Sequence, residues 1–176
     1  MPDKGLEDVV NQEHGELKNT LRHFDVAHIL GTIGSYAGSA GLAYVANKMT
    51  GRPYLSAALG SSIGDYVGYE AGFTPYWYWK NSDRYKGLGG KWKFAKDWTS
   101  FTVKSIPVEI GAYAANVPAA LLGTALMGGN PVLGTLVGGV AVDLLSWAGL
   151  RYLNKGKLRE VAEERLKYNG KPAYAH

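Results

Sequence analysis

Two aspartates, Asp65 and Asp143, lie within or directly after long uncharged stretches of the chain. Each follows a turn proline, Pro53 or Pro131, by 12 positions. At a helical rise of about 1.5 Å per residue this is about 18 Å, just past the middle of a lipid bilayer. Carboxylates at that depth are costly, and they suit a cation, a proton or the hydroxyls of a sugar. The alternative is a structural role in hydrogen bonds between helices.

The two aspartates occupy equivalent positions in an internal repeat. Residues 24–65 align with residues 101–143 at 12 identical positions, with an offset of 77 that becomes 78 after one inserted residue. A repeated helical hairpin with one acidic residue per copy is typical of small membrane proteins built by duplication. The repeat therefore predicts two similar hairpins. Its most distinctive matches are Phe24/Phe101, Tyr36/Tyr113, Pro53/Pro131 and Asp65/Asp143.

The distribution of charge indicates the surroundings of these helices. Residues 29–47, 53–64, 110–142 and 144–150 carry no charged side chain, although the mean hydropathy of the whole chain is only -0.15. A soluble amphipathic helix would show a charged face every few residues. We therefore predict an all-α polytopic membrane protein, and the alternative is a buried helical core. The four predicted transmembrane helices cover residues 26–47, 53–73, 103–126 and 131–153, each close to the length of about 20 residues that a span needs.

Lysine and arginine are concentrated outside the two hairpins, which predicts that both termini are cytoplasmic and that the protein is integral to the cytoplasmic (inner) membrane. The terminal segments have the apolar stripes of amphipathic helices that lie on a membrane or on a partner. The predicted segments are a cytoplasmic amphipathic helix over 1–25, a transmembrane hairpin over 26–73, a cytoplasmic aromatic and basic loop over 74–102, a second transmembrane hairpin over 103–153 and a cytoplasmic basic tail over 154–176.

Four further ionisable residues lie within or beside the predicted spans. Glu109 lies about one third of the way along the third span and could face either aspartate, so we include it in the predicted polar path. His28, Glu70 and Lys104 lie near the cytoplasmic boundary, where water can reach them. They are candidates for binding a ligand at the membrane interface.

An aromatic run follows the second predicted span. Tyr76, Trp77, Tyr78 and Trp79 carry rings with one apolar face and one polar edge, and such rings favour the membrane interface. The run is typical of an aromatic belt. The alternative is a platform that binds a lipid head group or a sugar.

Small residues recur four apart in the predicted spans. Such spacing lets two helix backbones approach closely, which can close the bundle or make a homo-oligomer. The predicted packing residues are Gly34, Gly38, Gly60, Gly64, Gly68, Gly134 and Gly138.

The sequence offers little support for an enzyme. There is no cysteine, and the HExxH and P-loop patterns do not occur. Residues 60–64, GSSIG, match the letters of the GxSxG pattern, but they lie inside a predicted span, without the strand that precedes this motif in hydrolases. We therefore expect a protein that is not an enzyme and that has neither a cofactor nor a metal site. The net charge of +4 fits basic flanks that face anionic lipids, so we expect membrane lipids and not nucleic acid as partners.

The layout resembles the GtrA-like family of small four-span membrane proteins. Phe24 and Phe101 enter the two halves, and the aromatic run after Phe73 follows the second span. The sequence departs from that pattern in two ways. The Asn-Arg pair expected before the aromatic run is missing, and the second half ends without a comparable run. The resemblance implies translocation of a polyprenyl-phosphate-linked sugar, or support of a membrane glycosyltransferase.

Three functions are compatible with these features. The first is translocation of a lipid-linked sugar, or of a small solute or ion, along a polar path that includes Asp65, Asp143 and Glu109. The second is a non-catalytic accessory subunit of a larger membrane complex. The third is an enzyme such as a lipid-head-group transferase that uses the two aspartates.

Overall fold

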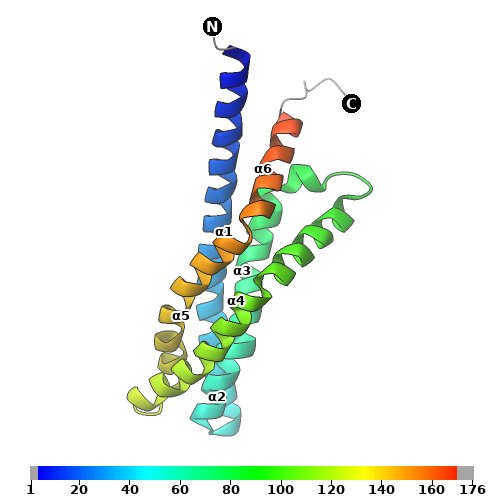
Figure 1. The fold of residues 1–176 in the computed structure, drawn as a ribbon. Helices are drawn as coiled ribbons and strands as arrows, with labels where there is room; N and C mark the ends of the chain where they lie inside the picture. Colours follow the sequence, from blue (N-terminus) through cyan, green and yellow to red (C-terminus); the bar gives the residue numbers. More distant parts are fainter. Residues whose placement is uncertain (1–3, 170–176) are drawn as a thin grey trace.

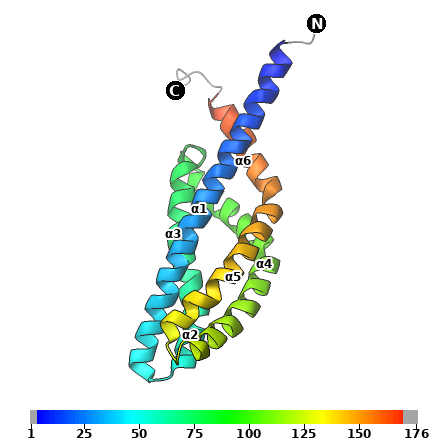
Figure 2. The same cartoon turned by 90° about the vertical axis from the view of Figure 1, so that its left-hand side faces the viewer.

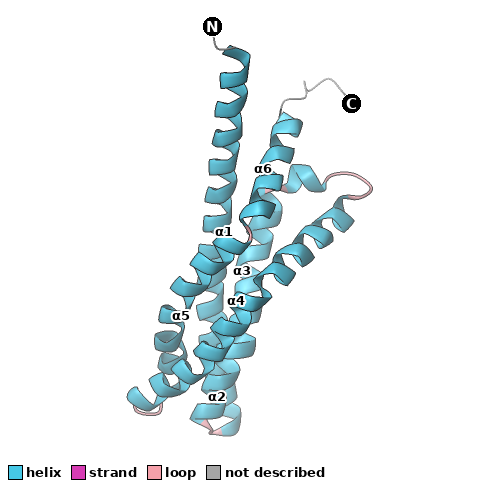
Figure 3. Ribbon diagram, in the orientation of Figure 1, coloured by secondary structure: helices cyan, strands magenta, loops and turns pink. Residues whose placement is uncertain are grey.

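The regular structure of this chain is helical throughout residues 4–169, the range whose backbone the computed structural model describes (Figure 3). Side chains are described except at residues 4–10, 12–13, 106, 109, 113, 141, 144–145 and 167–169. The predicted all-α class is confirmed for the described range, which contains no strand. In chain order the helices are α1 (Lys4–Thr50), α2 (Pro53–Leu59), the π-helical turn η1 (Gly60–Gly64), α3 (Asp65–Lys80), the 3-10 turn η2 (Ser82–Tyr85), α4 (Gly90–Leu126), α5 (Pro131–Leu153) and α6 (Lys155–Asn169).

Two helices are longer than the spans predicted from the sequence. α1 continues without a break through residue 25, because no proline within it removes a backbone donor. α4 begins at Gly90 and contains Pro107 and Pro118. Its parts Gly90–Ser105 and Ile110–Leu126 meet at 50°, as expected where a proline interrupts the hydrogen-bond ladder. Parts of the predicted segments 1–25 and 74–102 are therefore continuations of the hairpin helices.

The two hairpin turns use glycine before proline, as the sequence indicated. Gly51 has a φ of 63°, and Gly128 and Gly129 have φ values of 64° and 84°, a region that favours glycine. α2 and α5 each start with proline, whose missing N–H is not needed in the first helical turn. Asn130 also caps α5 by accepting hydrogen bonds from the next two backbone N–H groups at 3.1 and 3.2 Å.

The helices form two antiparallel pairs that lean on each other. α1 packs along η1 and α3, α4 packs along α5, and both α5 and α6 also contact α1. Residues 4 and 169 and the connection between η2 and α4 lie at one end of the molecule, which we call the polar end (Figure 1). Both hairpin turns lie at the opposite end, and the view turned by 90° shows the same separation (Figure 2). We call the part between these ends the body.

Glycines bring the helices of each pair into backbone contact. A methyl group added at Gly34 would overlap the carbonyl oxygen of Gly68, and one added at Gly38 would overlap that of Gly64. In the second pair, a Cβ at Gly138 would lie 2.6 Å from the backbone nitrogen of Ala120. Such approach is possible only without a side chain. The structure thus places these predicted packing glycines at the contacts within each pair.

The body has small polar side chains inside and large apolar side chains outside. Ser35 and Thr124 are 2% and 0% exposed, whereas Ile33, Val67 and Ile110 are 59%, 60% and 65% exposed. The polar end has the opposite arrangement, with Phe24, Phe73, Trp77, Phe101, Leu158 and Val161 in an enclosed apolar cluster. The two parts of one helical molecule therefore differ in which side chains they bury and which they expose.

Within the described residues, none of the helices taken singly has both the length and the apolar composition expected of a membrane span. The two parts of α4 on either side of its bend meet that criterion together.

Candidate functional site

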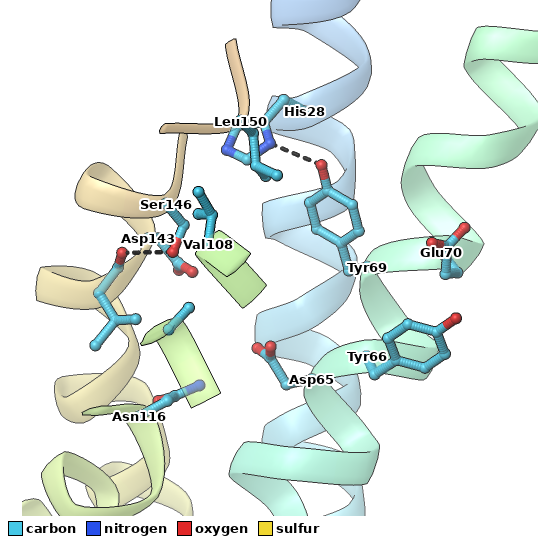
Figure 4. A pocket seen from close by; sticks show the side chains of 12 residues that line it. His28, Asp65, Tyr66, Tyr69, Glu70, Val108, Asn116, Asp143, Ser146 and Leu150 are labelled. Carbon is cyan, nitrogen blue, oxygen red and sulfur yellow. Dashed lines mark hydrogen bonds between the residues drawn. The ribbon is translucent and has the colours of Figure 1, made fainter. Parts of the chain in front are cut away.

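Asp65 and Asp143 line the same cavity, which lies between the two hairpins (Figure 4). The volume of the cavity is about 60 Å³. A single water molecule needs roughly 10–15 Å³ measured in this way, so the space suits a few water molecules or one ion. The tertiary structure has brought two repeat-related carboxylates, 78 positions apart in the chain, to one site. Other residues that line it are His28, Tyr69, Val108, Asn116, Ser146 and Leu150.

Asp65 reaches the cavity from the first turn of α3. The hydroxyl of Ser35 on α1 donates a hydrogen bond to Asp65 Oδ1, and Ser39 lies one helical turn further along α1. Ser35 and Ser39 are 2% and 3% exposed, so both hydroxyl groups are enclosed between helices. The hydrogen bond from Ser35 holds the Asp65 carboxylate against α1.

Asp143 faces a residue of the other hairpin, Tyr36 on α1. Tyr36 and Asp143 both pass over Gly139, where an added Cβ would lie 3.1 Å from the tyrosine ring. Asp143 Oδ2 is enclosed and accepts no hydrogen bond. One carboxylate oxygen at the cavity is thus left without a donor.

The π-helical turn η1 positions a third oxygen-bearing side chain, Asn116 of α4. The N–H of Asp65 donates to the carbonyls of Gly60 and Ser62, and the Ser61 carbonyl accepts a hydrogen bond from Asn116 Nδ2 at 3.2 Å. Asn116 is 4% exposed and its Oδ1 accepts no hydrogen bond. π-Turns inside helices are frequent at functional sites. Asn116 was not among the site residues predicted from the sequence, although as an amide within a predicted span it was a possible hydrogen-bond partner for the aspartates.

His28 and Glu70 reach the site but bond elsewhere. His28 is 6% exposed, and its Nδ1 lies 2.7 Å from the hydroxyl of Tyr69. Glu70 Oε2 accepts hydrogen bonds from Thr74 Oγ1 at 2.5 Å and from Trp98 Nε1 at 3.2 Å. Both polar side chains are therefore tied to the cavity wall toward the polar end.

Two of the remaining predicted site residues lie on α4. Lys104 is exposed on α4. Glu109 lies in α4, and its side chain is outside the described residues, so its predicted part in the polar path stays a prediction. Of the ionisable side chains proposed for the path, the structure thus places Asp65 and Asp143 together.

The aromatic run divides between interior and surface. Trp77 is 2% exposed and packs edge-on against Phe24 and Phe101, with ring centroids 6.2 and 5.3 Å apart. Trp79 is 63% exposed, and Lys80 Nζ lies 3.9 Å from the centre of its ring. Trp77 therefore belongs to the enclosed apolar cluster of the polar end, which accounts for its position without a ligand.

A wide apolar groove runs along the outside of the body beside the cavity. It has a volume of about 400 Å³ and is lined by α1 and α5, including Ile29, Ile33 and Val140. His28 and Asp143 line both the groove and the cavity. Asp143 therefore stands where the outer apolar surface and the inner polar space meet.

A second group of charges, at the polar end, was missed by the sequence analysis. Arg84 Nη2 lies 3.1 Å from Asp97 Oδ2, and Arg84 Nε lies 2.9 Å from Glu164 Oε2. Lys157 Nζ lies 2.7 Å from Asp97 Oδ1, and Lys93 Nζ lies 2.6 Å from Glu164. The cluster joins η2, α4 and α6. Its members come from two segments, residues 84–97 and 157–164, and stand there among other charged residues, so no local pattern marks them.

The ion pairs of this cluster shift the pKa values of Glu164 and Lys157. Burial alone would raise the pKa of Glu164, but hydrogen bonds from Lys93 and Arg84 outweigh it and the pKa is lowered. Burial alone would lower the pKa of Lys157, but its bonds to Asp97 and Glu160 outweigh it and the pKa is raised. The balanced, mutually paired charges hold helices together, and they leave little to bind a ligand.

Comparison with protein-family models, curated proteins and solved structures finds no match to this chain. Among the described residues there is also no group of three or more histidine, cysteine, aspartate or glutamate side chains that could hold a metal ion. The resemblance to the GtrA-like family therefore stays a prediction.

Proposed function

We propose that this chain is a small integral membrane protein that moves a small solute or ion through the polar cavity between its two hairpins. The embedding is supported by the body, where Ile33, Val67 and Leu122 are 59%, 60% and 62% exposed around buried serines and threonines. Lipid tails solvate such an apolar exterior, whereas water does not. The polar end, with its ion pairs and enclosed apolar cluster, would lie outside the hydrocarbon.

The observation that carries the transport proposal is the meeting of Asp65 and Asp143 in one cavity. None of the described residues that line this cavity is a lysine or an arginine. Carboxylates removed from water need a proton, a cation or a basic partner, because an unpaired charge in a low-dielectric site is unstable. The one histidine of this lining, His28, bonds to Tyr69, so the site suits a species that arrives from outside.

The volume of the cavity limits the size of the species that could pass through it. A volume of about 60 Å³ accommodates an ion, a proton relay or a few waters. A lipid-linked sugar is several times larger and would need the helices to separate, or it would have to travel along the outer groove that Asp143 borders. We therefore favour an ion or a proton over the sugar that the family resemblance implies.

Membrane embedding is tested on native membranes. The protein should stay in the membrane pellet after extraction with alkaline carbonate and should be released by detergent. Release by carbonate alone would reject the embedding and with it the transport proposal.

Transport is tested with purified protein in liposomes that report the movement of protons and alkali cations. We expect Asp65→Asn and Asp143→Asn each to lower the flux by at least about tenfold while the protein remains monodisperse. Asp83→Asn is the matched control, because Asp83 is 74% exposed at the polar end, where it pairs with Lys86. Equal flux in all four proteins, or loss of folding together with flux, would count against the proposal.

An accessory subunit is the second candidate, and the polar end supplies its support. Trp79, Leu88 and Trp92 are each more than 60% exposed there, at 63%, 112% and 78%. Exposed aromatic and aliphatic side chains outside a membrane commonly meet a partner protein. Gentle extraction followed by native mass spectrometry distinguishes the two: stoichiometric foreign subunits favour the accessory function, and a lone oligomer with flux favours transport.

A further inference from the structure

We propose that the surface between α1 and the helices α5 and α6 binds one anionic phospholipid. Its phosphate lies among three basic side chains, those of Arg151, Lys155 and Arg159, and an acyl chain lies in the outer apolar groove. This inference rests on the membrane embedding in the proposed function, because the lipid comes from a bilayer. It makes a separate claim, since a lipid can bind there whether or not an ion crosses the membrane.

The basic side chains line one pocket, which lies where α5 meets α6 and has a volume of about 500 Å³. We call it the basic pocket. α1 runs alongside both helices and closes its other side (Figure 2). Side chains four positions apart are neighbours on a helix surface. Four of the lining residues have this spacing: Trp147, Arg151, Lys155 and Arg159. The other lining residues are Leu17, Leu21, Ala148 and Tyr152.

The charges of the basic pocket match one phosphodiester. None of the described residues that line it is acidic. Arg151 Nη2 lies 3.5 Å from Asp25 Oδ2, and Arg159 Nε lies 3.1 Å from Glu163 Oε1. Lys155 is exposed and forms no ion pair with a described residue. Two paired cations and one unpaired cation leave a single positive charge, which the single negative charge of a phospholipid phosphate balances.

The basic pocket adjoins the outer apolar groove. Trp147 lines both, and the ion pair of Arg151 with Asp25 joins a residue of the pocket to one of the groove. Tryptophan favours the boundary between head groups and hydrocarbon. A charged space is thus followed, past an interfacial ring, by an apolar one. A phospholipid has the same order of polar and apolar parts.

The length of the groove fits one leaflet of a bilayer. On α1 it extends from Asp25 to Tyr36, 11 residue steps, which is about 17 Å at a helical rise of about 1.5 Å. Half of a hydrocarbon core of about 30 Å is about 15 Å. Ile29, Ile33 and Val140 are 57%, 59% and 52% exposed along it. An acyl chain covers these side chains and a free phosphate ion does not, so the occupant is a lipid.

The test is native mass spectrometry of the intact purified protein, delipidated in a non-ionic detergent and titrated with dioleoyl phosphatidylglycerol. Dioleoyl phosphatidylcholine supplies the same chains without net charge, and glycerol 3-phosphate supplies the phosphate without chains. We expect one phosphatidylglycerol to be retained at a concentration about tenfold below that needed for phosphatidylcholine. Equal retention of the two lipids would overturn the inference. Glycerol 3-phosphate bound as well as phosphatidylglycerol would show an anion site only and would overturn it too.

Two pairs of variants locate the lipid. Lys155→Gln should weaken phosphatidylglycerol binding by about fivefold, because it removes the unpaired cation. Lys91→Gln is the matched control, since Lys91 is an exposed lysine on α4 that does not line the basic pocket.

The second pair tests the groove. Ile33→Asn should weaken binding by about threefold or more, because an amide against an acyl chain loses its hydrogen bonds to water. Ile110→Asn is the control, at the repeat-related position on α4, where the side chain is 65% exposed and outside the groove. Equal affinities within either pair contradict the assignment.

Comparison with the flux and extraction assays separates this inference from the proposed function. Selective binding of phosphatidylglycerol without flux would keep the lipid site and reject transport. Flux without a preference for phosphatidylglycerol would keep transport and reject the lipid site. Release of the protein by alkaline carbonate would reject the embedding on which both rest.

Discussion

Arg84 and Asp97 form an ion pair whose side chains are only 1% and 4% exposed, with 3.1 Å between Nη2 and Oδ2. Arg84 lies in the 3-10 turn η2 and Asp97 lies on α4. Lys157 of α6 approaches the other oxygen of the same carboxylate at 2.7 Å. One buried carboxylate therefore ties three elements of the polar end together, and no ligand is needed to explain its burial.

Replacing Asp97 by alanine should destabilise the protein strongly. Removal of Asp97 takes away the most buried carboxylate from Arg84 and Lys157 and leaves them only the more exposed Glu164 and Glu160, and loss of one partner from a buried pair typically costs about 3–5 kcal/mol. Urea or thermal unfolding in detergent measures it. Asp83→Ala is the control, since the pair of Asp83 with Lys86 is 74% exposed on both sides and should leave the midpoint unchanged. Similar midpoints for the two variants would show that the buried cluster contributes little.

The folded protein should become less stable in acid, partly because the Glu164 carboxylate is protonated. Its pKa is lowered in the folded protein, because Lys93 and Arg84 outweigh the effect of burial. The unfolded state then binds the proton more readily, so this contribution is fully present above the ordinary value of 4.5 and is lost as the pH falls through the folded-state pKa.

The difference between the parent and Glu164→Gln, measured as unfolding midpoint against pH, isolates this group from the other carboxylates. The parent should be more stable at neutral pH, and the gap should close below about pH 4.5. A gap that is constant from neutral to acid pH would mean that the ion pairs of Glu164 do not stabilise the fold.

A methyl group at the contact between α1 and α3 should be poorly tolerated. The Cβ of Gly34→Ala would overlap the backbone carbonyl of Gly68, so the helices must separate, at a cost of about 1–3 kcal/mol. Gly41→Ala on the same helix meets nothing within 4 Å and should be neutral, or stabilising by up to about 1 kcal/mol. Unfolding midpoints of the two variants check this, and an equal effect at both positions would refute the close contact.

Adjacent tryptophans of the aromatic run should behave differently. Trp77→Ala removes an enclosed ring from the cluster with Phe24 and Phe101, which should cost about 3–5 kcal/mol. Trp79→Ala removes a ring that is 63% exposed and mainly contacts Lys80, and the loss should be about 1 kcal/mol or less. If both residues instead belonged to a surface platform for a ligand, the two variants would unfold alike and both would lose lipid binding.

Much of the architecture was predictable from local pattern. The glycines and prolines of the two turns, the repeat that pairs Asp65 with Asp143 and the small residues four apart all act over a few positions or recur at a fixed offset. The turn residues account for the start of α2 at Pro53 and of α5 at Pro131. The spacing of the small residues accounts for the contact between Gly34 and Gly68. The full lengths of α1 and α4 could not be predicted from local pattern, because a change from polar to apolar residues does not end a helix.

The sequence by itself determined an all-helical chain of two repeated hairpins, since turn chemistry and apolar periodicity are local properties. Only the tertiary structure decided that both aspartates face one cavity, that Asn116 joins them and that Arg84, Asp97 and Lys157 meet. These relationships depend on the rotation of each helix about its axis and on the angle at which the two hairpins cross. Both are set by close packing between residues far apart in the chain, which no local pattern encodes.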